Sequence, residues 1–218
     1  MRFAAVETST EWCSVALWRD GEIASLERRA VNRHSELALP MLERLLKDFK
    51  ELDAVAFGAG PGSFTGLRIA CGLAQGLALA RALPVIGISS LEAIAQESGE
   101  PRVVACIDAR MREVYYAALA KEKSGAGSRW NEVIAVQCIA PGAARLPPGE
   151  WVGAGNGFAV YGDLGLKRFF PEIHPTAIAV ARLAAPRLTA GEGVDPADAA
   201  PVYVREKVAF TQAELAQR

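Results

Sequence analysis

The sequence has few residues that could form a metal site or a catalytic triad. Its two histidines, His34 and His174, lie far apart, and neither has a second histidine nearby at ligand spacing. Its four cysteines include no Cys-X-X-Cys pair, so their spacing argues against a structural zinc site. A lone histidine is more often structural than catalytic, and the sequence supports no Ser-His-Asp arrangement.

The chain also lacks an excess of charge and a long apolar run. Its 218 residues include 24 Lys+Arg and 25 Asp+Glu, a formal net charge of −1. Without a basic excess, the isolated chain is not expected to bind RNA or DNA by neutralising phosphates. The longest apolar stretch, 67–83, contains Arg68, Gln75 and Arg81 and is short for a membrane span. Glu7 interrupts the first apolar run, so we expect no signal peptide and a cytoplasmic location.

What the sequence does contain is the composition of a globular protein. Hydrophobic residues make up 51% and charged residues 22%, which excludes intrinsic disorder. Cys13, Cys71 and Cys106 lie in apolar surroundings, so we expect buried, reduced thiols.

Periodicity predicts two similar halves. Each begins with a strand, a hairpin and a further strand, and then alternates helix and strand. In the first half we expect strands at 3–6, 12–19, 22–30, 53–57 and 85–88, and helices at 38–49, 66–82 and 90–96. In the second half we expect strands at 102–107, 113–120, 130–139 and 151–152, a loop or short helix at 141–148, a helix at 176–188 and a tail from 201.

This repetition indicates the fold class. Duplicated βββαβα units are similar to the plan of the actin-like ATPase (ASKHA) superfamily, an α/β class, with subdomains here at 1–98 and 99–218. The alternative is two unrelated α/β halves. Likeness of fold does not by itself establish function.

A glycine-rich segment joins the strand expected at 53–57 to the following helix, and it contains Gly60, Gly62 and Ser63. Backbone N–H groups and the helix dipole at a helix start favour an anion, so one interpretation is a phosphate contact. The other is a tight turn whose glycines allow close packing. The segment lacks the lysine of a P-loop.

The first strand of each half ends in an acidic residue. Glu7 is followed by Thr8 and Ser9, and Asp108 ends the corresponding strand of the second half. If these residues face each other across a cleft, they could hold Mg²⁺ and the phosphates of ATP or ADP weakly, although we expect no cofactor. Asp108 is not followed by glycine, however, and its carboxylate could equally pair with a neighbouring arginine.

Small residues recur at every fourth position along 62–82. One row is Gly62, Gly66, Ala70, Ala74, Ala78 and Ala82, and a second is Gly72, Gly76 and Ala80. Such rows let another helix approach closely, either inside the monomer or at a partner interface. We favour the interface, with Ala74 at its centre. The residues expected in it are Leu42, Leu45, Gly66, Ala70, Ala74, Leu77 and Ala78.

The nine residues 60–68, GPGSFTGLR, resemble the signature of the TsaB (YeaZ) family. Shorter matches extend the likeness over nearly the whole chain: 7–10, 33–36, 83–87, 107–111, 113–115 and 201–205. Family members usually carry Asp where Glu7 stands. The resemblance implies the actin-like fold and a part in making threonylcarbamoyladenosine beside the anticodon of tRNA.

The resemblance also implies a role without catalysis. Enzymes of the paralogous TsaD family carry two metal-binding histidines in an H-x-E-x-H-type motif, and the corresponding stretch here has Ser90 and Ile94 at those positions while keeping Glu92. Ile cannot ligate a metal, and Ser is a poor ligand for Fe or Zn. The implied function is a scaffold that binds TsaD, and with it the ATPase TsaE, and reaches tRNA only through that complex. Without TsaD the same face could form a homodimer.

Two other functions are alternatives. An ATPase or small-molecule kinase of the actin-like superfamily would use Glu7, Asp108 and the glycine-rich segment. A metallopeptidase relative is disfavoured by the missing histidine pair.

Overall fold

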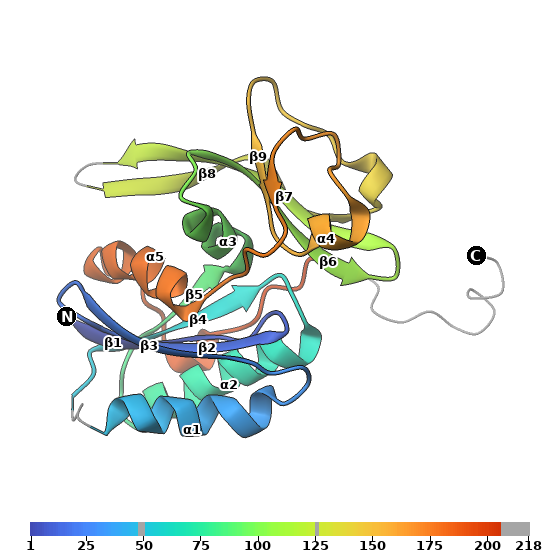
Figure 1. The fold of residues 1–218 in the computed structure, drawn as a ribbon. Helices are drawn as coiled ribbons and strands as arrows, with labels where there is room; N and C mark the ends of the chain where they lie inside the picture. The colour runs from blue at the N-terminus through green and yellow to red at the C-terminus, as the bar shows by residue number, and fades with distance from the viewer. Residues whose placement is uncertain (48–50, 125–126, 206–218) are drawn as a thin grey trace.

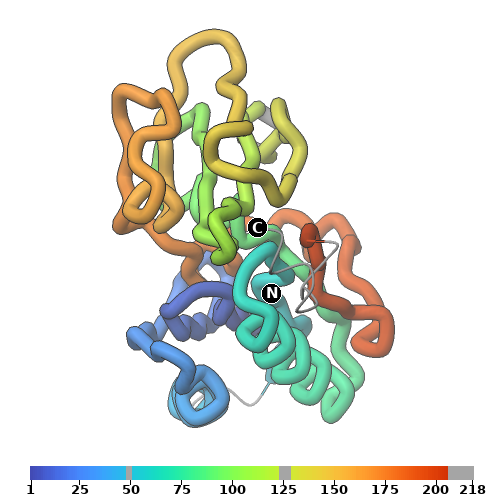
Figure 2. The backbone as a smooth tube through the Cα atoms, turned by 90° about the vertical axis from the view of Figure 1, so that its right-hand side faces the viewer, coloured from blue at the N-terminus to red at the C-terminus, as the bar shows by residue number. Residues whose placement is uncertain are grey.

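The computed structural model describes residues 1–47, 51–124 and 127–205. Two five-stranded sheets form two lobes, and helices lie below, between and above them (Figure 1). The tube in Figure 2 shows the same two lobes from the side. No helix of the described residues is long and apolar enough to cross a membrane.

The first sheet has the strand order β3-β2-β1-β4-β5. β2 pairs antiparallel with β1 and β3, whereas β4 pairs parallel with β1 and β5. Its strands are β1 (Arg2–Glu7), β2 (Trp12–Arg19), β3 (Glu22–Arg29), β4 (Ala54–Gly60) and β5 (Val85–Ser89). Asp20 and Gly21, the two-residue hairpin signal between β2 and β3, have φ of 50° and 102°.

The second sheet repeats this connectivity in the order β10-β9-β6-β7-β8. β6 takes the central place of β1, the hairpin β7–β8 takes that of β2–β3, and β9 and β10 are the parallel strands. Its strands are β6 (Arg102–Arg110), β7 (Glu113–Ser124), β8 (Gly127–Ile139), β9 (Val152–Ala154) and β10 (Phe169–Phe170). The predicted duplication is confirmed, although the two-residue strand β10 had no recognisable pattern.

Helices cover the first sheet on both faces. α1 (His34–Leu46) and α2 (Phe64–Leu79) pack on one face, and α5 (Ala177–Thr189) packs on the other. The division at 98 and 99 placed α5 with the second subdomain, but its alanines are buried against Phe3 and Ala5 of β1. The chain therefore crosses back to complete the core of the first lobe.

The second lobe has fewer helices. α3 (Ser90–Ser98) lies between the lobes, where it packs on β6 and on α5, and α4 (Gly157–Tyr161) covers the other face of the second sheet. Only the 3-10 helix η1 (Pro141–Ala143) stands between β8 and β9, where the first lobe has α1. A further 3-10 helix, η2 (Pro196–Asp198), packs against α2.

Two helices contain an internal proline. α1 begins at His34, four residues before the expected start at 38, so Pro40 lies in its interior. α5 continues past Pro186 to Thr189, one residue beyond the expected end. Phe49 and the tail beyond Arg205 lie outside the described residues. The prediction of buried thiols is confirmed at Cys13, Cys71 and Cys106.

His174 lies in the segment by which the chain returns from β10 to α5. Its ring stacks on Trp12, with centroids 4.4 Å apart, and its Nε2 lies 3.2 Å from Oε1 of Glu27. Burial by itself would lower the pKa of His174, but Glu27, the carbonyl of Glu172 and the charge of Glu11 together outweigh it, so the pKa lies above its ordinary value of 6.5. The contact therefore stabilises the fold fully below pH 6.5 and loses its effect as the pH rises through the raised pKa.

Glu27→Gln is accordingly expected to destabilise the protein more at low pH. The loss in the free energy of unfolding should be up to about 1 kcal/mol near pH 6 and close to zero near pH 9, measured by urea denaturation at both values. The control is Glu22→Gln, on the same strand and paired with exposed Arg19. It should change the free energy of unfolding by the same amount at both pH values. An equal loss of unfolding free energy for Glu27→Gln at both pH values would contradict the role of Glu27 in raising the pKa of His174.

Candidate binding cleft

The glycine-rich segment leads from β4 into α2 and packs against the turn after β1. Ser63 caps the helix by accepting a hydrogen bond from the N–H of Gly66, and its own N–H donates to the carbonyl of Ser9 at 2.7 Å. Thr8 Oγ1 donates to the carbonyl of Gly66 at 2.7 Å. A Cβ on Gly62 would lie 2.4 Å from the Ser9 carbonyl oxygen. The glycines are therefore required for close packing. This agrees with the interpretation of the segment as a tight turn.

Glu7 does not reach the space in front of this loop. Its side chain is 1% exposed and accepts hydrogen bonds from the N–H of Ser9 at 2.5 Å and from Ser90 Oγ at 3.2 Å. Burial raises the pKa of its carboxyl group above the ordinary value, despite these hydrogen bonds. In this geometry the carboxylate of Glu7 is closed off from the cleft, so the structure does not support its expected role as a metal or phosphate contact.

The partner of Glu7 is one of the positions that the resemblance aligns with a metal-binding histidine. Ser90 is fully buried at the start of α3, and Ile94, at the other position, belongs to the apolar core of the second lobe. Glu92 lies on the same helix, where burial raises its pKa. The described residues contain no group of three His, Cys, Asp or Glu side chains able to hold a metal ion.

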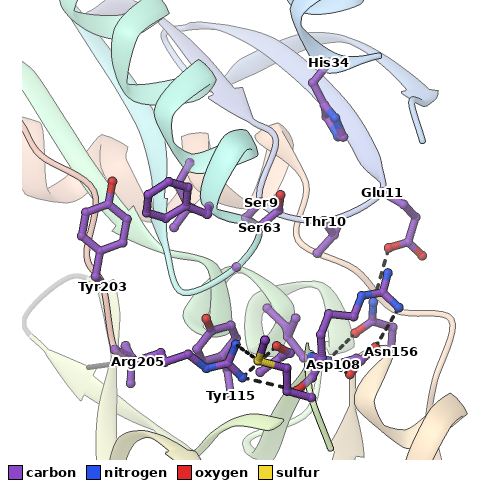
Figure 3. A pocket seen from close by; sticks show the side chains of 18 of the residues that line it. Ser9, Thr10, Glu11, His34, Ser63, Asp108, Tyr115, Asn156, Tyr203 and Arg205 are labelled. Atoms are coloured by element: carbon purple, nitrogen blue, oxygen red, sulfur yellow. Dashed lines mark hydrogen bonds and ion pairs between the residues drawn. The ribbon is translucent and has the colours of Figure 1, made fainter. Parts of the chain in front are cut away.

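A cleft of about 610 Å³ opens between the two lobes. Its walls come from the β1–β2 turn, the starts of α1 and α2, the β6–β7 turn and the segment 202–205 (Figure 3). Of the predicted phosphate-site residues, Ser9, Gly62, Ser63 and Asp108 line it. Glu7, Thr8 and Gly60 are buried and do not line it.

Asp108 is held by groups of its own lobe. Its Oδ1 accepts hydrogen bonds from the N–H of Arg110 at 2.9 Å and from the hydroxyl of Tyr161 at 3.1 Å, and its Oδ2 lies 3.1 Å from the guanidinium of Arg110. The Asp108 N–H donates to Asn156, whose amide also donates to Glu11 at 3.3 Å. Pairing with a neighbouring arginine, the second interpretation of Asp108, is thus the observed arrangement.

These residues do not fit a Mg²⁺–nucleotide centre. Such a centre needs exposed carboxylates with free oxygens, whereas Glu7 is buried and both oxygens of Asp108 already have partners.

The segment 202–205 contributes contacts that sequence reasoning missed. The Val202 N–H donates to the carbonyl of Ala59 in the first lobe, and Tyr203 packs on Phe64 with ring centroids 5.5 Å apart. In the second lobe Arg205 donates to the carbonyl of Ala109 at 2.9 Å and to Glu113 at 2.6 Å. The segment therefore joins both lobes at the mouth of the cleft. Its match to the family pattern was the available signal.

The predicted interface residues are mostly inside the first lobe. Leu42, Ala70, Ala74 and Ala78 are 0–2% exposed and belong to the core beneath the sheet. Gly66 is buried too, and it packs so closely that a Cβ there would lie 1.9 Å from the Thr8 carbonyl oxygen. The row containing Ala74 therefore packs within the monomer, and its assignment to a partner interface is wrong. Leu45 and Leu77 are partly buried against the same core.

The second row of small residues faces outward. Gly72 and Gly76 are exposed, and a Cβ at either would meet no heavy atom within 4 Å. Leu79 beside them is 62% exposed, and Leu39 on the neighbouring helix α1 is 48% exposed.

Comparisons with known proteins agree with this architecture. The family model described as TsaD, tRNA N6-adenosine threonylcarbamoyltransferase, matches residues 27–159. The tRNA threonylcarbamoyladenosine biosynthesis protein TsaB of Escherichia coli K12 is 38% identical over 96% of this chain and 97% of its own length. The TsaB of Haemophilus influenzae is 37% identical over 94% of each chain.

A solved structure supports the same relationship. YeaZ from Pseudomonas aeruginosa has a TM-score of 0.84 and 36% identity, covering 93% of this chain and 99% of that one. All three matches exceed 30% identity and cover at least 93% of this chain, so they extend over both lobes. The chain therefore belongs to the TsaB (YeaZ) family, with an actin-like fold related to that of the TsaD transferases.

Proposed function

We propose that this chain is a non-catalytic scaffold subunit in the formation of threonylcarbamoyladenosine in tRNA. The names of its E. coli and H. influenzae relatives place those proteins in that biosynthesis. The observation that supports a scaffold role is the burial of Ser90 and Ile94, where the resemblance to TsaD would put metal ligands. Ser90 donates a hydrogen bond to Glu7, and Ile94 packs in the apolar core of the second lobe.

A TsaD-type catalytic subunit would dock on the outward face of α1 and α2. A glycine in an exposed helix interior costs about 1 kcal/mol relative to alanine, and a Cβ at Gly72 or Gly76 would meet none of the described residues within 4 Å, so no close packing in this part of the chain requires a glycine there. A partner helix lying across them could approach closely and cover exposed Leu39 and Leu79. A second copy of this chain could occupy the same face in the absence of TsaD, with like helices facing each other.

The experiment that tests the function is a reconstitution with purified TsaD-type and TsaE-type subunits from the same organism. The complete set is expected to modify the tRNA adenosine, and omission of this chain should abolish the product. With a net charge of −1, the chain alone should bind tRNA only weakly. Modification of adenosine by the chain alone would overturn the proposal.

Gly76→Arg is expected to remove the TsaD contact and leave the monomer folded. Arginine has a better helix propensity than glycine and points into open space here, so stability should rise by up to about 1 kcal/mol, while the bulk and charge should weaken the complex by about a hundredfold or more. Co-purification and thermal unfolding measure the two effects. Gly142→Arg, at an equally open position of η1, is the control and should leave the complex intact.

The alternative of an ATPase or small-molecule kinase is supported by the cleft, in which Ser9, Gly62, Ser63 and Asp108 do meet. It would require the buried carboxylate of Glu7 to become accessible. Metal-dependent ATP hydrolysis by the purified chain, abolished by Glu7→Gln, would favour it over the scaffold.

A further inference from the structure

The turn between β6 and β7 has a backbone that its own residues disfavour. Arg110 pairs with Glu113 across the hairpin, so the loop between the strands consists of Met111 and Arg112. Positive φ runs through three successive residues here, with 62° at Arg110, 54° at Met111 and 60° at Arg112. A residue with a Cβ crowds the neighbouring carbonyl oxygen in this left-handed region. The turn therefore needs support from elsewhere in the fold.

Another two-residue turn of the same chain shows what this one lacks. Between β2 and β3 the corresponding positions are Asp20 and Gly21, with φ of 50° and 102°. An Asp-Gly pair favours a turn with two positive φ values. Met111 and Arg112 have neither the glycine nor the short polar side chain that suits such a turn. The β2–β3 turn is thus specified locally, whereas the β6–β7 turn depends on a tertiary contact.

Arg205 supplies this contact from a distant part of the chain. Its guanidinium donates to the carbonyls of Ala109 at 2.9 Å and Arg110 at 3.3 Å, and to the carboxylate of Glu113 at 2.6 Å. These acceptors stand immediately before and after the two loop residues. The Arg205 side chain is 12% exposed, so its charge-assisted hydrogen bonds are largely excluded from water. Arg205 therefore fixes both ends of the loop.

The residues that precede Arg205 are seated on the first lobe. The Val202 N–H donates to a carbonyl of β4 at 2.8 Å, and the Tyr203 ring packs on Phe64 at the start of α2. Figure 3 shows Tyr203 beside this helix, and Arg205 turned from there toward Tyr115 of the second lobe. The segment 202–205 thus binds the first lobe at one end and the β6–β7 turn at the other.

Few contacts hold the segment 202–205 in place. It is part of no helix or strand, and Val202 and Tyr203 are 53% and 47% exposed. Within the described part of the chain, its one backbone–backbone hydrogen bond is that of the Val202 N–H. Segments with few buried contacts open locally at a much lower free energy than the whole fold. The segment can therefore leave its place while both lobes stay folded.

We propose that the segment 202–205 is a releasable strap that couples the surface at the start of α2 to the conformation of the β6–β7 turn. With Arg205 in place, the loop keeps its left-handed backbone, and Asp108 Oδ1 accepts a hydrogen bond from the Arg110 N–H. When Arg205 leaves, the loop relaxes and this hydrogen bond is lost. The inference stands apart from the scaffold role and needs no bound ligand, because all its contacts lie within the free chain.

The first test changes the strap in one lobe and measures the turn in the other. Tyr203→Ala removes the ring that packs on Phe64 and leaves Arg205 intact. In hydrogen exchange of the full chain, the amides of 110–113 are expected to exchange about tenfold faster than in the wild type, while those of β1 keep their rate. The control is Val160→Ala, a 56% exposed side chain on α4, which should leave 110–113 unchanged.

The second test replaces the tertiary contact by a local preference. Arg205→Gln should speed exchange at 110–113 about tenfold or more. In a chain that also carries Met111→Asn and Arg112→Gly, the Asn-Gly pair favours the turn by itself, so Arg205→Gln should change the rate less than about twofold. Arg129→Gln removes another ion pair between the lobes, that with Glu192, and should leave 110–113 unchanged in both backgrounds.

Three results would overturn the strap. They are unchanged exchange at 110–113 in Tyr203→Ala, an effect of Arg205→Gln that is equally large with and without the Asn-Gly turn, and faster exchange throughout the chain rather than at 110–113. If Arg205→Gln does not fold, Arg205→Lys takes its place with the same expected result, because lysine keeps the charge but lacks the forked geometry that reaches several acceptors at once.

Discussion

Gly66→Ala is expected to destabilise the protein by about 3 kcal/mol or more. The first turn of α2 lies directly against the backbone that leaves β1, and a Cβ at this position would be 1.9 Å from the Thr8 carbonyl oxygen. Backbone cannot yield as a flexible side chain can, so α2 would have to move outward. That movement would break the hydrogen bond from Thr8 Oγ1 to the Gly66 carbonyl and open the floor of the cleft.

Urea denaturation of both proteins measures this loss. Gly72→Ala on the same helix is the control, because its Cβ would meet no heavy atom within 4 Å, and it should stabilise the protein by about 0.5–1 kcal/mol. Opposite signs for two glycine-to-alanine changes in one helix would separate a steric requirement from helix propensity. Stability of Gly66→Ala equal to that of the wild type would contradict the packing described here.

Ala74→Arg is expected to unfold most of the molecules. Ala74 is fully buried in the core between α2 and the first sheet, and an unpaired buried charge costs about 3–5 kcal/mol. Total stabilities of about 5–15 kcal/mol leave little after such a loss. The sequence pattern had instead placed Ala74 at the centre of a partner interface, where the same substitution would have spared the fold.

The comparison with Gly76→Arg makes this distinction measurable. Both variants place an arginine on α2 two residues apart, one facing the core and one facing open space. Circular dichroism during heating should show a lost or strongly lowered transition for Ala74→Arg and an unchanged or raised one for Gly76→Arg. A thermal transition of Ala74→Arg at the wild-type temperature would contradict the burial of Ala74 in the core.

Much of the fold could be predicted because its signals are local. Apolar strand segments such as β2, the Asp20-Gly21 turn and the capping Ser89 before α3 each depend on residues within a few positions of one another. The return of α5 to the first sheet could not be predicted in this way. Its helical pattern shows an apolar face but does not say which of two similar sheets that face will cover.

The candidate site was predicted only in part for a similar reason. Ser9, Gly62, Ser63 and Asp108 do line one cleft, since the ends of the central strands of two equivalent sheets face each other. Glu7 shares that strand end, but its side chain turns inward to Ser90, 83 positions away in the chain. Nothing near Glu7 in the sequence reveals this partner.

The amino-acid sequence by itself determined the class of fold, the family and the absence of histidines at the TsaD metal positions, because these depend on residue identity and short-range spacing. Tertiary structure alone decided which row of small residues on α2 faces the core, where the carboxylates of Glu7 and Asp108 point, and that 202–205 closes the cleft. These outcomes depend on contacts between segments far apart in the chain, and helix periodicity is equally compatible with either orientation of a face lined by small residues.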